Sequence, residues 1–370
     1  MNWIVVGLML GTGCLLALNI LLPSILRPIG GRRARRRDHA WERKALHKVS
    51  VLVPAYNEEH AIVAKIDTLA KALERLEVDW EVLIGSDGST DDTVRLAQER
   101  LARVGDGRWR VIEYPNEGKC ITINKLIKAA SGDLIVSTDA DIPVPPDSIE
   151  LIVRAFEADD RLGCVSCVPV FEDRDIGGQR YYWRMEDKVR QAESALGMLI
   201  VVTGMLYAFR REAFEEIPRG VMADDLWIPL CALLNGHDSV RIDELRIPYE
   251  KTDEITENRR RRRVILGGVD AVWRLWPRLV HKPKVLVLVL AHKVNRWLAP
   301  IWLAIHLAVA GLVAPVLLVG YAAVVAGWAW MVGPHRLWRL GQAAVTPLYS
   351  LRDMVRRNDL SRWEHTRRPQ

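Results

Sequence analysis

The chain has 370 residues, of which 49% are hydrophobic and 26% are charged, a balance that excludes a largely disordered protein. The averages conceal strong segregation, because residues 3–22 and 298–333 carry no charged side chain. The first of these runs is long enough to cross a bilayer as a helix, so a purely soluble protein is not expected.

Positive charge is concentrated directly after the first apolar run. Residues 27–48 hold nine Lys and Arg against two acidic residues, whereas the whole chain has a net charge of +6. A basic collar beside a membrane helix is typical of the cytoplasmic side, and it favours anionic lipid over nucleic acid as the partner. No basic segment precedes the run and no small-residue cleavage site follows it. We therefore expect an uncleaved anchor at residues 1–26 and a juxtamembrane collar at 27–48.

The middle of the chain alternates between short apolar runs and amphipathic segments. Strands are predicted at 49–53, 80–84, 109–113, 134–137 and 162–170, and helices at 58–76, from 91, at 118–130, from 147, at 179–196 and within 221–235. This alternation predicts an α/β fold with a mainly parallel sheet, whose ligands bind at the carboxyl ends of the strands.

The cysteines give no sign of a disulfide framework, which favours a reducing compartment for the soluble part. Cys164 and Cys167 form a single C-x-x-C within a predicted strand. A zinc site needs more ligands and a redox pair is expected at a helix start, so we interpret both as core residues.

Acidic residues follow the predicted strands. Asp87 comes after the second strand, and Asp139 and Asp141 come after the fourth. Alternate residues of an extended segment face the same way, so both carboxylates of this D-x-D can meet one Mg²⁺ or Mn²⁺, which completes its shell with substrate phosphates. Each motif alone is also compatible with a simple turn. Together at one sheet edge they favour a site for a cation and its ligand.

Two further charged motifs extend this site. Asp224 and Asp225 precede an apolar helix, where they either stabilise the helix dipole or leave one carboxylate with a raised pKa that can act as a base. Residues 259–263 are five consecutive Arg, which suit a lipid surface or a pyrophosphate. The phosphate-binding P-loop and the G-x-G-x-x-G fingerprint are both missing from the sequence. A cation, Arg residues and a carboxylate base predict glycosyl transfer from a nucleotide sugar.

The C-terminal third is expected to return to the membrane. Residues 283–297 are apolar and then basic, as in an interfacial helix, and residues 298–333 are too long for one ordinary span. Because Gly and Pro interrupt this second run, we predict a transmembrane hairpin there, followed by a basic cytoplasmic tail at 334–370.

Six segments between about Val49 and Gly268 occur in a characteristic order. They are VSVLVPAYNEE, SDGSTDDT, NEGKCITIN, STDAD, TGMLYAFRREAF and ADDLWIPL. With them the sequence resembles the membrane-anchored family-2 glycosyltransferases. The resemblance implies a cytoplasmic GT-A domain at residues 49–282.

The resemblance also implies roles for individual residues. Those expected around the nucleotide sugar are Ala55, Tyr56, Glu58, Asp87, Lys119, Asp139, Arg260 and Arg263. Asp139 and Asp141 would bind the metal, Asp225 would be the base with Asp224 in support, and Thr203 and Gly204 would line the acceptor side.

One departure from the family bears on the product. Processive synthases carry Q-x-x-R-W before their last membrane segments, and here the Arg is retained at Arg263 while Arg260 and Val264 replace Gln and Trp. The resemblance therefore favours transfer of one or a few sugars over long-chain polymerisation.

We therefore predict an inverting, metal-dependent glycosyltransferase on the cytoplasmic face of a bacterial inner membrane. It would use a nucleotide-diphosphate sugar and a lipid or lipid-linked acceptor in envelope or exopolysaccharide assembly, with proteins of that pathway as partners and no nucleic acid. The alternatives are a processive polysaccharide synthase and an inactive membrane scaffold or regulatory partner.

Overall fold

The structure, a computed structural model, describes residues 3–33, 46–104, 106–171, 179–249, 254–313 and five positions between 315 and 322. Its strands are β1 (Lys48–Ala55), β2 (Asp79–Asp87), β3 (Trp109–Tyr114), β4 (Leu134–Thr138), β5 (Leu162–Phe171), β6 (Leu206–Arg210) and β7 (Asp238–Tyr249). Its helices are α1 (Trp3–Arg33), α2 (Ile62–Leu73), α3 (Thr93–Val104), α4 (Lys119–Ala129), α5 (Ser148–Ala158), α6 (Gln179–Ala195), α7 (Asp224–Leu234), α8 (Glu254–Leu279), α9 (Pro283–Leu288) and α10 (Asn295–Val313). A 3₁₀ turn covers Arg211–Ala213, and a π-helix, Val289–Val294, joins α9 to α10.

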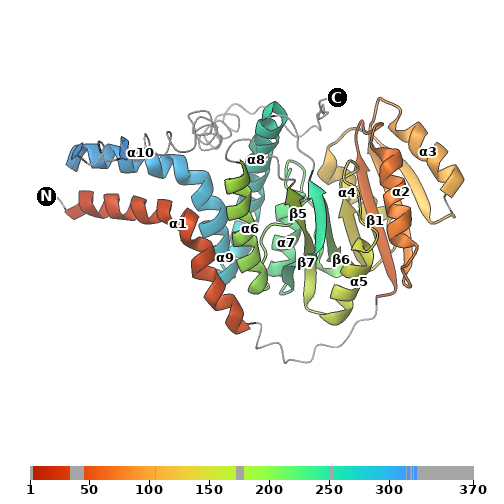
Figure 1. Ribbon diagram of the computed structural model, residues 1–370, viewed down its shortest axis with the longest axis horizontal. Coiled ribbons are helices and arrows are strands. Elements are labelled where there is room, and N and C mark those ends of the chain that lie inside the picture. The colour runs from red at the N-terminus through yellow and green to blue at the C-terminus, as the bar shows by residue number, and fades with distance from the viewer. Residues whose placement is uncertain are drawn as a thin grey trace.

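The strands form one sheet in the order β3-β2-β1-β4-β6-β5-β7 (Figure 1). The pairs β3–β2, β2–β1, β1–β4 and β5–β7 are parallel, which confirms the predicted α/β class. Only β6 runs the other way, antiparallel to both β4 and β5. The sequence pattern did not predict β7 or the reversal at β6, because strand order depends on pairing between segments far apart in the chain.

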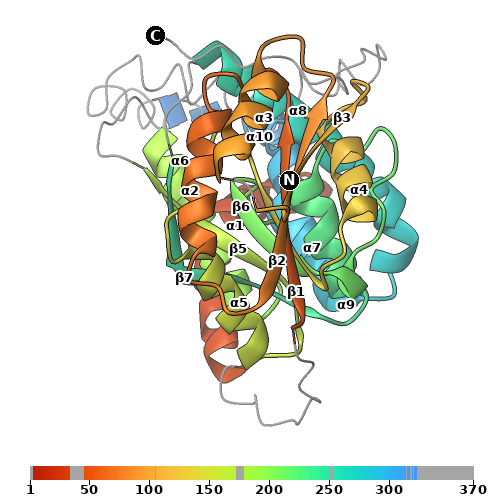
Figure 2. The same ribbon diagram turned by 90° about the vertical axis from the view of Figure 1, so that its right-hand side faces the viewer.

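Helices cover both faces of the sheet, with α2 on one side and α4 and α7 on the other (Figure 2). Successive strand residues point to opposite faces, so Val51 packs in the core beneath α2, whereas Leu52 packs in the core beneath α4. Both faces of β1 are therefore buried, which explains why it reads as a continuous apolar run. Cys164 and Cys167 are buried in β5, as predicted.

A polar network joins the strands at the edge where β1 and β4 begin. Glu81 accepts hydrogen bonds from the Ser50 hydroxyl (2.7 Å) and the Ser131 amide (2.6 Å), and these outweigh burial and lower the pKa of Glu81 to about 2. Asp133 accepts the amides of His47 and Lys48 at 2.9 and 2.8 Å. The turn before β4 thereby sets the register of β1 against β2 and β4.

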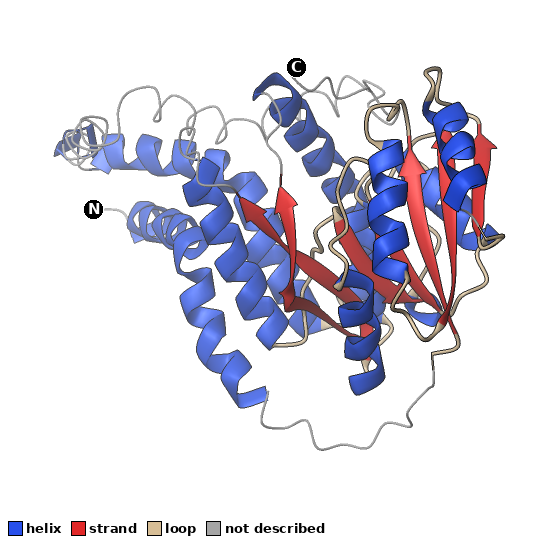
Figure 3. Ribbon diagram, turned by 45° about the vertical axis from the view of Figure 1, so that its right-hand side comes forward, coloured by secondary structure: helices blue, strands red, loops and turns tan. Residues whose placement is uncertain are grey.

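The apolar helices project away from the sheet, where α1 and α10 lie side by side (Figure 3). The Thr12 hydroxyl lies 3.0 Å from Nδ1 of His306, and the Asn295 amide donates to the carbonyl of Leu15 at 2.9 Å. Two helical stretches, Gly7–Pro28 and Pro283–Leu312, are long and apolar enough to cross a membrane, judged by length and composition alone.

Helix boundaries in these regions differ from the expected segments. Helix α1 continues through residue 26 into the collar, because the basic residues there are compatible with a helix. Helical structure is also continuous across residues 297 and 298, so the predicted interfacial helix and the start of the hairpin form one run. Most of the collar, the second half of the hairpin and the tail lie outside the described residues, and their arrangement stays a prediction.

Gly132 tests the network at the start of β1 and β4. A Cβ at this position would lie 2.6 Å from Oγ of Ser50 and 2.7 Å from the backbone oxygen of Lys48. Because backbone atoms cannot move aside as a flexible side chain can, we expect Gly132→Ala to lower the free energy of unfolding by about 1–3 kcal/mol. Thermal unfolding in detergent measures this, with Gly11→Ala as the control because nothing lies within 4 Å of a Cβ there. An unchanged melting temperature would contradict the close packing.

Candidate active site

The carboxyl ends of β1, β2 and β4 meet at one edge of the sheet, as predicted from their sequences. Asn57 has a left-handed φ of 54° and connects the loop after β1 to the loop after β2. Its amide donates to Oγ of Ser89 at 3.1 Å, and its side-chain oxygen accepts the Thr90 amide at 2.8 Å. The amide of Glu58 donates to the Thr93 hydroxyl at 2.7 Å. These bonds hold the Ala55–Glu58 segment beside the end of β2.

Asp87, at the end of β2, is fully buried. One carboxylate oxygen accepts the Glu117 amide and the Thr122 hydroxyl, both at 2.9 Å, and the other accepts the Gly118 amide at 2.9 Å. Burial raises the pKa of Asp87, and these hydrogen bonds oppose the rise. Its observed contacts fix the loop that leads into α4. The nucleotide contact expected of it stays a prediction.

Lys119, the first residue of α4, joins two of the predicted acidic motifs. Its ammonium lies 2.7 Å from Oδ1 of Asp139 and 3.4 Å from Oδ2 of Asp224. Burial alone would lower the pKa of Lys119, but these two carboxylates raise it above its usual value. The lysine is therefore a permanent cation between the D-x-D turn and the Asp224–Asp225 pair.

The Asp224–Asp225 pair opens α7 as predicted. Asp224 is buried and accepts a hydrogen bond of 2.8 Å from the hydroxyl of Tyr207, on β6. Asp225 is partly exposed, and burial together with the charge of Asp224 raises its pKa. The positive charges of Lys119, Lys293 and Arg190 oppose this rise. Asp225 thus has the raised pKa expected of a general base.

Thr203 and Gly204 lie beside these carboxylates. A Cβ on Gly204 would lie 3.7 Å from the Lys119 ammonium and 3.9 Å from the Asp139 carboxylate, so this glycine lies directly beside that ion pair. The preceding amide, of Val202, donates to the backbone oxygen of Asp225 at 2.9 Å. The structure therefore brings together the predicted donor side, base and acceptor side.

Two residues near this site were not identified from the sequence. Arg190, on α6, donates to the Thr203 hydroxyl at 2.8 Å. Lys65, on α2, is 1% exposed and donates to the Thr138 hydroxyl at 2.8 Å and to the Ile142 carbonyl. Lys65 was detectable, because it occupies the same helix face as Ile62 and Ile66, where a lysine is unusual. Arg190 was not detectable in the sequence, because polar and apolar residues are mixed on the faces of its helix.

Lys65 holds both ends of the D-x-D turn, since its two partners flank residues 139–141. Burial lowers the pKa of Lys65 to about 7. The negative charges of Asp139, Asp141 and Glu58 oppose this shift. The three acidic residues predicted for the site therefore share one electrostatic environment.

The donor set of this turn suits a hard divalent cation. The described residues contain no group of three or more His, Cys, Asp or Glu side chains placed to hold a metal by themselves. Mg²⁺ and similar ions typically take one or two carboxylates and complete their shell with water and substrate phosphates. Asp139 and Asp141 fit that mode of binding, with the remaining ligands supplied by a bound diphosphate.

The Arg run is the predicted feature that the structure connects least clearly to the site. It lies in α8, where Arg263 is partly buried, and the side chain of Arg260 is outside the described part. The structure places Tyr56 in the loop after β1. The nucleotide-binding roles of these three residues stay predictions.

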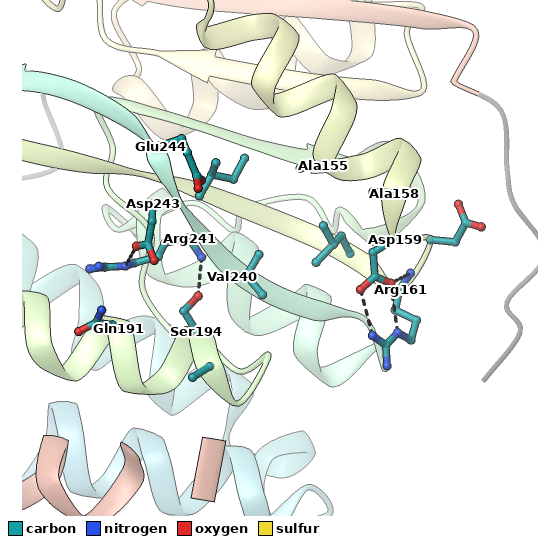
Figure 4. Close-up of a pocket in the computed structure, with 14 residues that line it drawn as sticks. Ala155, Ala158, Asp159, Arg161, Gln191, Ser194, Val240, Arg241, Asp243 and Glu244 are labelled. Atoms are coloured by element: carbon teal, nitrogen blue, oxygen red, sulfur yellow. Dashed lines mark hydrogen bonds and ion pairs between the residues drawn. The ribbon is translucent and has the colours of Figure 1, made fainter. Parts of the chain in front are cut away.

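A cavity of about 700 Å³ lies at the opposite edge of the sheet, between α5, α6 and β7 (Figure 4). Its two arginines are both paired, Arg161 with Asp159 at 2.9 Å and Arg241 with Asp243 at 2.7 Å. It contains none of the predicted site residues, and neither of its arginines is left without a carboxylate partner.

The family of the central domain follows from its sequence. A model described as glycosyl transferase family 2 matches residues 50–218, the segment that contains the strand-end loops and the D-x-D turn. Residues 50–218 form a family 2 glycosyltransferase domain.

The curated relatives of the family 2 domain include undecaprenyl-phosphate sugar transferases and a chondroitin synthase. An undecaprenyl-phosphate 4-deoxy-4-formamido-L-arabinose transferase of Enterobacter sp. (strain 638) is 35% identical over 123 residues, which cover 33% of this chain and 38% of that protein. A Proteus mirabilis (strain HI4320) protein of the same name is 28% identical, with 46% and 52% covered. A chondroitin synthase of Escherichia coli is 37% identical over 122 residues, 33% of this chain and 17% of that protein. The matches thus span about half or less of these relatives.

The fold agrees with this family. A mannosyltransferase from Pyrobaculum calidifontis, solved in complex with GDP-mannose and Mn²⁺, superposes with a TM-score of 0.66 over 93% of this chain and 100% of its own. At 23% identity the likeness shows the fold alone, and that fold is GT-A.

The lowered pKa of Lys65 predicts a pH dependence of stability. Between pH 7 and 10.5 the unfolded chain retains a proton on this lysine that the folded chain has lost, so stability rises with pH in that window. Below pH 7 both states are protonated and the slope disappears. From pH 7 to 9 the gain is about 2 kcal/mol.

Melting temperatures of the wild type and Lys65→Met at pH 7 and 9, measured in EDTA, test this. We expect the wild type to gain several degrees more than the variant, and Lys71→Met, an exposed lysine of the same helix, to behave as the wild type. Equal gains in all three proteins would show that Lys65 keeps its proton.

Proposed function

We propose that the chain is a membrane-bound inverting glycosyltransferase that moves a sugar from a nucleotide-diphosphate donor to a lipid or lipid-linked acceptor. The convergence of Asp139 and the Lys119 ammonium, both in the family 2 domain, with Asp224, directly after it, is the observation that carries this proposal. The names of the curated relatives support a lipid-phosphate acceptor, and a role in envelope biosynthesis is part of the same proposal.

The donor is assigned to the edge formed by β1, β2 and β4. The segment Ala55–Glu58 and the end of β2 would hold the nucleoside, and Asp139 and Asp141 would hold a divalent cation on its diphosphate. When bound, that cation supplies positive charge that stabilises the departing diphosphate. Lys119 lies beside the same turn and adds a fixed cation without needing to move.

Asp225 is assigned as the base. It removes the proton from the attacking hydroxyl as the oxygen bonds to the anomeric carbon, and the bond from that carbon to the diphosphate oxygen breaks on the opposite face. The configuration at the carbon is therefore inverted. Asp224 keeps the pKa of Asp225 raised and is itself held by Tyr207 and Lys119.

The two candidate membrane helices support a location at a bilayer. The basic collar after the first of them favours a cytoplasmic domain and the bacterial plasma membrane. A multi-pass arrangement and partner proteins of a polysaccharide pathway are part of the same proposal.

Release of nucleoside diphosphate tests the proposal directly. The full chain is assayed in detergent with UDP- and GDP-sugars, Mn²⁺ and membrane lipid extract. We expect release that stops in EDTA and returns with Mn²⁺, and that falls at least about 100-fold in Asp225→Asn because the base is lost. Asp243→Asn, an exposed carboxylate on β7, is the matched control and should keep the wild-type rate. Metal-independent release, or full activity in Asp225→Asn, would refute the assigned chemistry.

The raised pKa of Asp225 predicts the acid limb of the pH profile. Activity is present when Asp225 is ionised and is lost as the pH falls through its pKa, which lies above the usual aspartate range. Because the charge of Asp224 contributes to this rise, Asp224→Asn should move the limb of kcat/KM to lower pH. A limb that stays in place in that variant would assign the titration to another group.

A further inference from the structure

A cluster of buried charges lies where α6 meets the π-helix. Glu186, on α6, is 2% exposed and contacts Arg190 Nε at 3.2 Å, Lys293 Nζ at 3.2 Å and the Arg296 guanidinium. His292, which is fully buried in the π-helix, lies 3.2 Å from Glu186 and 2.7 Å from Glu193. This cluster connects α6 to the second candidate membrane helix.

Several cationic side chains contact Glu186, and their total positive charge exceeds the single negative charge of this carboxylate. Burial would raise the pKa of Glu186, but the charges of Lys293, Arg296 and His292 hold it well below its usual range, so the carboxylate is ionised. Among the described residues, Glu186 is the only acidic side chain in contact with Arg190 or Lys293. Their side chains are 13% and 15% exposed, so they are held in place but remain open to a small ligand.

These two cations lie near the assigned base. They share the Glu186 carboxylate, and the charges of both oppose the rise in the pKa of Asp225. Arg190 also donates to Thr203, on the acceptor side of Gly204. Lys119 and the D-x-D turn lie on the other side of Gly204, which is the side assigned to the donor.

The position of the cations suits a ligand that arrives from the bilayer. Lys293 belongs to the helical run Pro283–Leu312, one of the two stretches able to cross a membrane. Helix α6 lies between the sheet and α1 (Figure 1). An amphiphile that follows the apolar helices would bring its polar head to Arg190 and Lys293 before reaching Asp225.

We propose that Arg190 and Lys293, positioned by Glu186, bind the phosphate group of the lipid acceptor beside Asp225. This inference rests on the proposed function and specifies its acceptor as a lipid phosphate monoester, whose P–OH group is the attacking hydroxyl that Asp225 deprotonates. A guanidinium contacts two phosphate oxygens at once, and an ammonium adds a point charge. The arrangement differs from a metal site, because it holds the acceptor and leaves the donor diphosphate to Lys119 and the D-x-D turn.

Direct binding tests this inference without requiring turnover. The full chain in detergent is titrated with undecaprenyl phosphate and, separately, with undecaprenol, which has the same chain and no phosphate, and complexes are counted by native mass spectrometry. We expect the phosphate lipid to bind more tightly to the wild type. Arg190→Gln and Lys293→Met should each weaken it about tenfold or more, without changing undecaprenol binding. Lys284→Met, an exposed lysine at the start of α9, is the matched control and should bind as the wild type does.

Two competing assignments have their own outcomes. If phosphatidylglycerol displaces undecaprenyl phosphate at equal concentration, the cluster is a general phospholipid headgroup site and the acceptor assignment is refuted. If the variants weaken donor binding in Mn²⁺ and spare the phosphate lipid, the cations belong to the donor diphosphate. Equal binding of the two polyprenyl lipids by folded wild type refutes the inference as well.

A kinetic arm separates this inference from the proposed function. Where the wild type releases nucleoside diphosphate, Arg190→Gln should raise the KM for undecaprenyl phosphate more than it lowers kcat, and Arg190→Lys should recover part of the loss. A change in kcat alone would give Arg190 a merely structural role. If the wild type binds the phosphate lipid but releases no diphosphate with any donor, the catalytic proposal fails while the binding site stands.

Discussion

The site depends on one contact, the Lys119 ammonium between Asp139 and Asp224. Each partner lies at the end of a different element, so a single cation joins the start of α4, the turn after β4 and the start of α7. Without it, two carboxylates would face each other in a partly buried setting, which costs several kcal/mol per uncompensated charge. The same cation lowers the pKa of Asp225, which limits how far the base is pushed toward its neutral form.

The sheet topology explains why these elements meet. Parallel pairing of β2, β1 and β4 aligns their carboxyl ends, and the antiparallel β6 then starts at that same edge, where Leu206 pairs with Thr138. Because β6 begins where β4 ends, the segment before it crosses directly over the D-x-D turn. Gly204 lies there beside the Lys119–Asp139 ion pair. The reversed strand thus brings the segment proposed as the acceptor side to the edge that is proposed to bind the donor.

Helix α6 carries the connection from this edge to the apolar helices. Glu186 and Arg190 lie four residues apart, so one helix face reaches the π-helix on one side and Thr203 on the other. A π-helix places an extra residue within a turn and is frequently found at functional sites. Here it brings His292 and Lys293 to the same glutamate. Glu186 and Glu193 offset part of the positive charge gathered here, which lowers the cost of burying it.

Much of the fold and of the donor edge followed from local sequence alone. Apolar runs that alternate with amphipathic segments indicated the parallel strands, and the rule that ligands bind at strand ends selected Asp87, Asp139 and Asp141. The membrane character followed from two uncharged runs and a basic collar. What only the tertiary structure decided is which distant charges meet: Lys65 under the D-x-D turn, Lys119 between two carboxylates, and Lys293 on Glu186. Local periodicity reports which face of an element is buried, but a salt bridge is an interaction at a few ångströms between segments that the chain separates by tens to more than a hundred residues. Those distances are set by strand order and helix packing, and no local pattern records them.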